Sequence, residues 1–161
     1  MMNEKKAIQD FYSDQMSHCY GCGRLNNFGM KLKSYWNEEE ESSIATYIPK
    51  AHQTAFPGFV YGGLIASLID CHGTGTAAAA AYKAEGRKIG TEPELRYVTA
   101  SLHVDYLKPT PIDQELVLIG KVKEIKGRKV TTEVKLFAAE QLCAQGEVIT
   151  VKIPETMIFK K

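Results

Sequence analysis

A single carboxylate, Asp70, lies in the apolar first half of residues 64–86. A charge on a buried helix is costly unless it is paired or its pKa is shifted. Gly62 and Gly63 stand about two helical turns earlier, where bare backbone N–H groups at a helix start favour negative charge. This combination could supply a base or nucleophile and an oxyanion hole toward a carbonyl group. The alternative is a core aspartate that is hydrogen-bonded to a neighbouring strand.

The element that must position these groups is a helix over residues 64–86. The stretch is apolar at most positions and then rich in Ala, Gly and Thr, which predicts a helix buried all round. Gly86 is a good helix stop. The length could suggest a membrane span, but Asp70, His72 and two glycines interrupt the apolar run, so we expect a core helix.

Strands are predicted on both sides of this helix, and the whole chain is expected to be one α+β domain, 1–161. Alternating residues and turn signals predict strands over 30–36, 42–49, 94–109, 114–127, 128–140 and 141–154. Residues 38–41 form an acidic hairpin turn. Residues 1–17 are expected to form a short helix, and 18–29 a Gly- and Cys-rich turn packed with it on the body. The order fits one curved antiparallel sheet around a single helix.

The overall composition excludes several classes of protein. The 161 residues are 44% hydrophobic and 24% charged, and the net charge of +1 offers no broad field for nucleic acid or an anionic membrane. Four cysteines are too few for a disulfide scaffold. The N-terminus lacks the apolar core of a signal peptide, so the cytoplasm is the expected compartment.

The sequence also contains the start of a metal-ligand pattern. His18, Cys19 and Cys22 lie close together, but no second pair at finger-like spacing follows. Cys71 or His72 could complete the set only through an accident of the fold. We therefore expect no metal site, and interpret this segment as a turn of small residues that packs near the carboxylate.

Other polar residues have weaker signals. His72 is expected to pack in the core or at an interface, because it points away from Asp70 on a helix. His103 lies four residues after Thr99 in a strand, so the two should share a face, with packing the favoured role. His52, in the loop before the helix, is a candidate for contact with a substrate. Lys108 belongs to scattered cations that could bind phosphate, although solvated lysines are the common case.

Three motifs in chain order carry a resemblance to a known family. They are HCYGCGRLNNFGMKL at 18–32, PGFVYGGLIASLID at 57–70 and TASLHVDYLKPTP at 99–111. The second is similar to Gly-x-x-His-Gly-Gly followed by a distant Asp, and the third to a strand ending in Tyr-x-x-Pro. On these motifs the chain resembles the hotdog-fold thioesterases, specifically the PaaI-like branch of the acyl-CoA thioesterase superfamily.

The resemblance implies a hotdog fold and hydrolysis of an acyl-CoA without a metal or a cofactor beyond the CoA of the substrate. Asp70 matches the catalytic general base or nucleophile, and Gly62 and Gly63 match the helix start whose N–H polarises the carbonyl. Thr99 matches the Ser or Thr that holds the attacking water or the carboxylate. The resemblance implies that this residue comes from the partner subunit, so that the site lies at the interface of a homodimer or homotetramer.

Two positions depart from the family pattern and leave other functions open. Tyr61 replaces the usual His before Gly-Gly, and Ala55 stands where relatives often have Asn or Gln. Tyr61 keeps a hydroxyl donor and Gln53 is close to the vacated position, so both are candidate substrate-binding residues with His52 and Lys108. The first rival is a hotdog protein that binds an acyl ligand without turnover. The second is an acyl-thioester dehydratase or hydratase, which usually needs the missing His.

Overall fold

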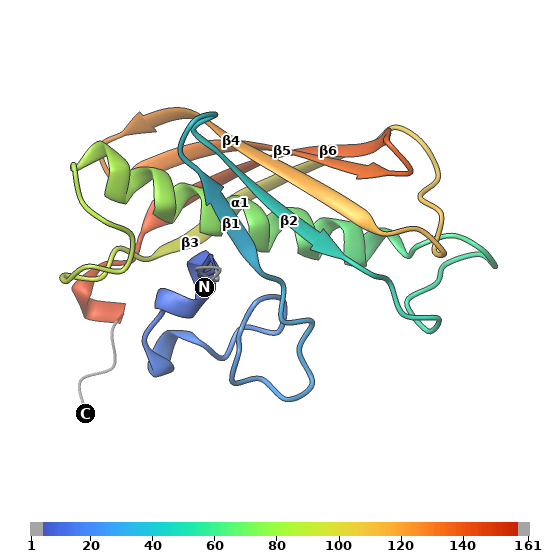
Figure 1. Ribbon diagram of the computed structural model, residues 1–161, viewed down its shortest axis with the longest axis horizontal. Coiled ribbons are helices and arrows are strands. Elements are labelled where there is room, and N and C mark those ends of the chain that lie inside the picture. The colour runs from blue at the N-terminus through green and yellow to red at the C-terminus, as the bar shows by residue number, and fades with distance from the viewer. Residues whose placement is uncertain (1–4, 158–161) are drawn as a thin grey trace.

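The strands before and after the long helix join in one sheet. A computed structural model describes residues 5–157, and within them six strands form a single antiparallel sheet in the order β1-β2-β4-β5-β6-β3. The strands are β1 Ser34–Asn37, β2 Ser42–Tyr47, β3 Tyr97–Tyr106, β4 Leu116–Lys126, β5 Lys129–Ala138 and β6 Gln141–Lys152. Figure 1 shows the single long helix, α1 Gly62–Ala84, across one face of the curved sheet. The predicted α+β hotdog architecture is confirmed.

Helix α1 approaches the sheet closely through glycine. A Cβ built on Gly73 would lie 2.6 Å from a methyl of Val148 on β6, and one built on Gly146 of β6 would lie 2.6 Å from Ile69. Because these contacts leave no room for a side chain, the helix axis lies nearer the sheet than larger residues would allow. Most side chains of α1 are buried by this contact, as predicted. No helix among residues 5–157 is long and apolar enough to cross a membrane.

The ends of α1 fall two residues before the predicted ones. Tyr61 is the N-cap, and the last helical residue is Ala84. Gly86 adopts the left-handed conformation, with φ +66°. The N–H of Arg87 then donates a hydrogen bond of 2.9 Å to the carbonyl of Tyr82. This arrangement satisfies carbonyls that the helix end would leave bare. The predicted role of Gly86 as a helix stop is therefore confirmed.

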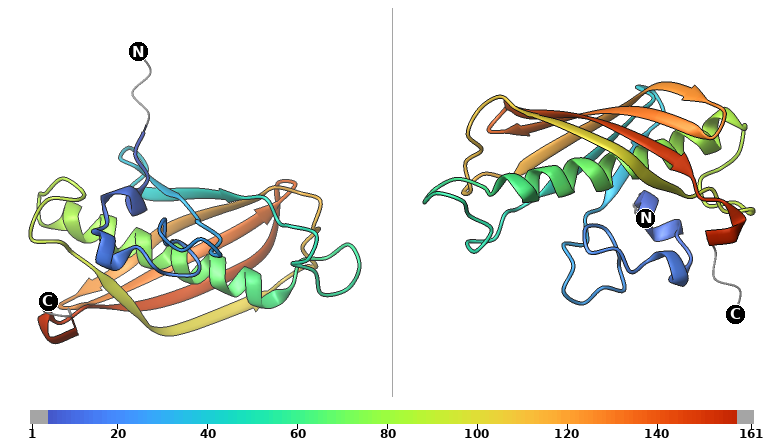
Figure 2. Two further views of the ribbon diagram at one scale, coloured as in Figure 1. Left: turned by 90° about the horizontal axis from the view of Figure 1, so that it is seen from below. Right: turned by 180° about the vertical axis from the view of Figure 1, so that it is seen from behind.

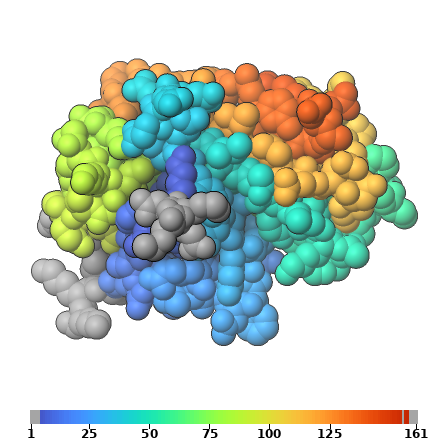
Figure 3. Space-filling model, in the orientation of Figure 1, coloured from blue at the N-terminus to red at the C-terminus, as the bar shows by residue number. Residues whose placement is uncertain are grey.

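The predicted helix over residues 1–17 is wrong where the structure describes it, and residues 1–4 lie outside the described part. The segment forms two 3₁₀ turns, η1 Ile8–Phe11 and η2 Asp14–Met16. A helix this short is marginal in water, so tertiary contacts decide its shape. Ile8 and Tyr12 are buried against Trp36 and the alanines of α1. Figure 2 shows this segment on the side of α1 away from the sheet, and in Figure 3 the N-terminal residues lie below β1 and β2.

The first predicted strand is also shorter than expected. Residues 30–32 pair with the preceding loop instead of with β2: the N–H of Met30 bonds to the carbonyl of Tyr20, and that of Leu32 to the carbonyl of Gly21. Lys31 between them has φ +55°, which interrupts an extended strand. This pairing holds the Gly- and Cys-rich loop against the body of the protein.

A buried polar network joins α1 to the first two strands. The ring of His72 is fully buried, with Ser34 Oγ 2.8 Å from Nδ1 and Ser43 Oγ 3.1 Å from Nε2. Gln9 of η1 extends the network to the backbone and hydroxyl of Ser34. Burial lowers the pKa of His72 to about 4, so the ring is neutral in the folded protein. The core role predicted for His72 is confirmed.

This buried imidazole predicts a stability that falls in acid. Its pKa is about 4 when folded against 6.5 as a model value, so only the unfolded chain binds a proton between these pH values. Stability is therefore lost as pH falls from about 6.5 to about 4, by up to about 3 kcal/mol. Urea unfolding at a series of pH values measures this loss. His72→Gln should flatten the dependence, and equal slopes in variant and wild type would contradict the prediction.

Candidate active site

Asp70 lies on the flank of α1 that faces strand β3. The hydroxyl of Thr99 on β3 donates a hydrogen bond of 2.5 Å to Asp70 Oδ1. Thr74, one turn further along α1, has its hydroxyl 3.3 Å from that of Thr99 and donates to the carbonyl of Asp70 at 2.7 Å. The carboxylate is half-buried and Thr99 is exposed, so a hydrogen-bonded acid lies at the edge of the core.

The surroundings of Asp70 change its acidity in opposing ways. Burial raises the pKa of Asp70, the hydrogen bond from Thr99 lowers it, and the nearby Cys19 thiol raises it. The net direction is upward. A carboxylate with a raised pKa is a better proton acceptor near neutral pH than a fully solvated one.

A bulge in β3 brings two distant hydroxyls to the same helix. The pairing of β3 with β6 shifts register between Thr99 and Ser101. Residues seven apart would lie on opposite faces of a regular strand, but one extra residue puts Thr99 and Tyr106 on the helix side. The Tyr106 hydroxyl donates to the carbonyl of Gly62 at 2.8 Å. β3 is thus anchored to α1 at both ends of the site.

The same bulge corrects two expectations. Thr99 belongs to the same chain as the Asp70 that it contacts, whereas the family resemblance implied that it comes from the partner subunit. His103 does not share a face with Thr99, because the extra residue moves it to the outer side of the sheet. Its side chain is 71% exposed there and lies 3.0 Å from Asp105.

The start of α1 presents its backbone donors as the glycine pair suggested. Within residues 5–157, no acceptor receives the N–H of Gly62 or Gly63. The ring of exposed Tyr61 packs against Gly63, where an added Cβ would lie 2.0 Å from the Tyr61 hydroxyl. The N–H groups and the phenol of Tyr61 therefore form one donor-rich edge at the helix N-terminus.

An apolar pocket opens beside this helix start, with a volume of about 520 Å³. It lies between the 51–61 loop, α1 and the end of β3, and Gly62 and Lys108 are in its wall. Its apolar lining includes Phe56, Phe59, Ile65, Tyr106 and Leu107. Ala55 also lines it, so the position where relatives often carry an amide faces the pocket here.

Three of the four predicted substrate-binding residues, Gln53, His52 and Tyr61, are not in the lining of this pocket. Gln53 is engaged in the fold: its amide bonds to the Tyr47 hydroxyl at 2.8 Å, and its side-chain oxygen accepts the N–H of Lys50 at 2.8 Å. It therefore has a structural role that the sequence did not reveal. His52 is exposed in the neighbouring turn and does not line the pocket.

A matching family profile supports what this geometry suggests. The profile of the thioesterase superfamily matches residues 57–144, more than half of the chain. The chain belongs to the thioesterase superfamily. The matched range begins at the pocket loop and contains α1, Asp70 and Thr99.

Known relatives extend the match beyond this range. Acyl-coenzyme A thioesterase THEM4 of Xenopus laevis is 32% identical over 108 residues, which are 67% of this chain and 43% of that protein. The chain thus spans less than half the length of this relative. A thioesterase superfamily protein from Shewanella loihica is 49% identical, with a TM-score of 0.66 over 89% of this chain and 100% of that one. The PaaI protein of E. coli shares the fold at 14% identity and a TM-score of 0.59, over 71% and 74%.

Sequence reasoning missed several residues of the candidate site. Tyr106 had a signal, because it closes the Tyr-x-x-Pro motif, but nothing in the sequence indicated that its hydroxyl binds Gly62. Thr74 lies four residues after Asp70, a spacing that places it on the same side of a helix. Phe56 and Phe59 had no signal, because aromatic residues in a loop do not show which surface they line.

The Asp70–Thr99 hydrogen bond predicts a shift in pH dependence. Thr99→Val removes a donor that lowers the Asp70 pKa, so this pKa should rise further. A base works when deprotonated, so the acid limb of kcat/KM for thioester cleavage should move to higher pH. At a fixed pH on the acid limb the value should fall about tenfold, the range of a hydrogen bond to a charged group. Ser101→Ala, on the outer face of β3, should leave the profile unchanged, and an unmoved limb in Thr99→Val would exclude this coupling.

Proposed function

We propose that the chain hydrolyses an acyl-CoA thioester to the free acid and CoA, with Asp70 as general base or nucleophile. The observation that supports this most is the half-buried Asp70, raised in pKa and held by Thr99 at the surface of the core. Membership of the thioesterase superfamily and the name of the Xenopus relative point to the same chemistry.

In the proposed reaction, Asp70 moves the proton and the helix start stabilises the charge on the carbonyl oxygen. The Asp70 carboxylate takes a proton from water while the water oxygen attacks the thioester carbonyl. Backbone N–H groups at Gly62 and Gly63 stabilise the oxyanion that forms. The intermediate then collapses, the carbon–sulfur bond breaks, and the CoA sulfur leaves with the proton returned by Asp70. If Asp70 attacks directly, water cleaves the resulting anhydride in a second step.

One chain alone cannot bring both parts of this machinery to one carbonyl. Asp70 and Gly63 lie on the same helix, about 10 Å apart along its axis. A carbonyl oxygen within hydrogen-bond distance of Gly63 is therefore too far from Asp70 of the same chain. We propose that Asp70 works with the helix start of a second copy.

Strand β3 offers the surface for that second copy. It is an edge strand with exposed Leu102 and Tyr106, 39% and 54% accessible. Exposed edges of this kind readily pair with another strand. Antiparallel pairing of two β3 strands about a two-fold axis at His103, with Ala100 as the extra residue of the bulge, would set Thr99 opposite Tyr106 of the partner subunit. Since Tyr106 contacts Gly62 within its own chain, Asp70 would then face Gly63 of the partner subunit.

The pocket beside the helix start is the proposed acyl site. Its apolar wall suits a hydrocarbon or aromatic acyl group, and Lys108 at its rim could pair with a CoA phosphate. Tyr61 would replace the usual histidine as a hydroxyl donor near the oxyanion, and exposed His52 could contact the CoA portion. We propose a homodimer, or a tetramer built from it, in the cytoplasm, where its four free thiols would stay reduced.

The role of Asp70 predicts a large loss of turnover on substitution. Asp70→Asn keeps the shape but not the basicity of the side chain, so thiol release from a panel of acyl-CoAs should fall by about 10²- to 10⁴-fold. Asp113→Asn, at an exposed position away from the site, is the matched control and should retain activity. Equal rates in Asp70→Asn and wild type would remove Asp70 from its proposed role.

The same panel separates the rival functions. Calorimetric binding of acyl-CoA without thiol release from any panel member would favour a non-catalytic binding protein, which Ala55 and Tyr61 would explain. Hydration of a crotonyl-type thioester without thiol release would instead indicate a hydratase.

The proposed shared site predicts complementation between two inactive variants. Asp70→Asn keeps its helix start. Gly63→Pro keeps its acid but loses one oxyanion donor and displaces the exposed Tyr61 ring, while proline itself is tolerated in the first helical turn. Refolding the two together should restore about a quarter of the wild-type rate, because half of the dimers contain one intact site. A site within one chain would recover nothing, since every chain carries a defect. Circular dichroism of each variant controls for folding.

A further inference from the structure

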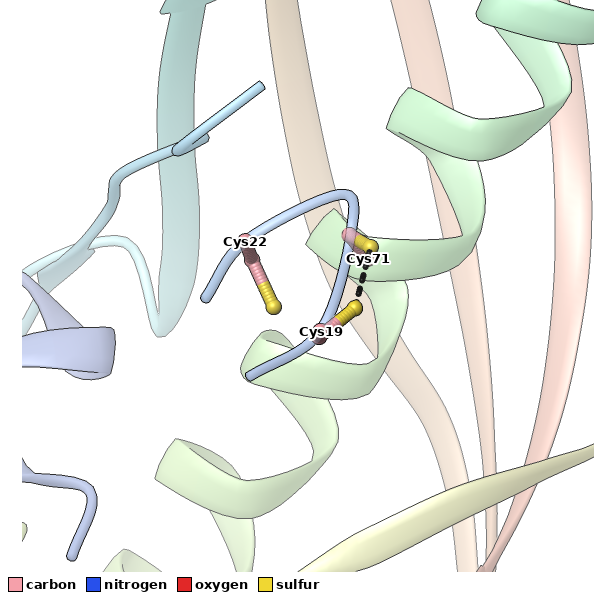
Figure 4. A group of neighbouring side chains, drawn as sticks. All are labelled: Cys19, Cys22 and Cys71. Atoms are coloured by element: carbon pink, nitrogen blue, oxygen red, sulfur yellow. Dashed lines mark hydrogen bonds between the residues drawn. The ribbon is translucent and has the colours of Figure 1, made fainter. Parts of the chain in front are cut away.

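Three cysteines from two distant segments meet beside Asp70. Cys19 and Cys22 lie in the 18–29 loop, and Cys71 follows Asp70 on α1. Their sulfurs all lie within 4.8 Å of one another, and those of Cys19 and Cys71 are 3.8 Å apart. Figure 4 shows the three side chains around a common space between the loop and the helix. His18, which the sequence grouped with them, is not part of this cluster.

The spacing of the Cys19 and Cys71 sulfurs matches a tetrahedral metal centre. Zinc binds cysteine sulfur at about 2.3 Å in tetrahedral geometry, which places two sulfurs of one ion about 3.8 Å apart. The Cys19–Cys71 separation has this value. A disulfide instead needs about 2.0 Å, and three thiols cannot all pair in one.

The loop that carries Cys19 and Cys22 is tightly determined. A Cβ on Gly21 would lie 2.2 Å from the Cys71 sulfur, and one on Gly23 would lie 2.5 Å from the backbone of Cys19. The N–H of Gly23 bonds to the carbonyl of Cys19 at 2.8 Å. These close contacts hold Cys19 and Cys22 beside Cys71.

We propose that Cys19, Cys22 and Cys71 bind one Zn²⁺ ion through their three sulfurs. Sulfur ligands favour a soft or borderline cation, and exposed Cys19 gives the ion a path from solvent to the buried sulfur of Cys71. Each sulfur that binds as a thiolate releases its proton to solvent. The fourth tetrahedral position is left for water.

Bound zinc would connect two parts of the chain. Residues 19–22 precede the sheet, and Cys71 is in the middle of the core helix, so the ion would fasten the N-terminal loop to α1. The proposed hydrolysis routes no step through this ion. Binding can therefore be tested without a substrate, and its failure leaves the role of Asp70 untouched.

Cobalt and zinc binding to the reduced full-length protein tests the proposal. Metal-stripped wild type should bind about one Co²⁺ per chain with thiolate-to-cobalt charge-transfer absorption, and Zn²⁺ should displace it. Loss of even an outer partner of a metal ligand costs 10- to 100-fold in affinity, so Cys19→Ser should weaken binding at least about tenfold. Cys143→Ser removes a buried thiol of β6 outside the cluster and should bind as wild type does. Zinc should also raise the melting temperature of wild type more than that of Cys19→Ser.

Three results would overturn the proposal. One is a wild type that binds neither metal under reducing conditions. Another is a Cys19→Ser protein that binds as tightly as wild type. The third is a stable disulfide among the three cysteines, seen as the loss of two hydrogens in the intact mass, with no metal bound after reduction. Because Cys19 is exposed, its serine variant should fold, and circular dichroism verifies this.

Discussion

Close contact between α1 and the sheet is the constraint on which the rest of this structure depends. At Gly73 and Gly146 the helix and β6 approach so nearly that a single added carbon would overlap Ile69 or Val148. A helix at this distance brings its flank level with the edge strand β3. Asp70 can then reach Thr99 while the apolar side chains on the same helix remain in the core. A larger residue at either glycine would move the acid away from its partner.

The irregularity of β3 is the second condition for the site. Without its bulge, Thr99 and Tyr106 would face opposite sides of the sheet, and only one of them could contact α1. With it, the strand is tied to the helix beside Asp70 and again beside Gly62, while its outer edge stays open. The proposed catalytic acid and the proposed dimer surface thus depend on one local distortion.

The other side of α1 is covered by the N-terminal residues, which make polar contacts there beside the apolar ones of Ile8 and Tyr12. Ser34, itself bonded to Gln9, satisfies one side of the buried His72, and the cysteine loop packs on the preceding residue, Cys71. Asp70 therefore lies between an edge strand and a thiol cluster, on a helix whose neighbours fix its rotation. Burial from both sides raises its pKa while leaving a path to solvent.

The sequence alone determined the fold class, the central helix and the position of Asp70 and the glycine pair within it. Hydrophobic periodicity, glycines at turns and helix ends, and the order of the motifs are local signals that can be read from the sequence. Only the tertiary structure decided that Thr99 contacts Asp70 of its own chain, that Gln53 supports the loop, and that Cys71 joins the cysteine loop. These pairings depend on a strand bulge and on close backbone contacts between residues far apart in the chain, and neither is encoded in the spacing of residue types.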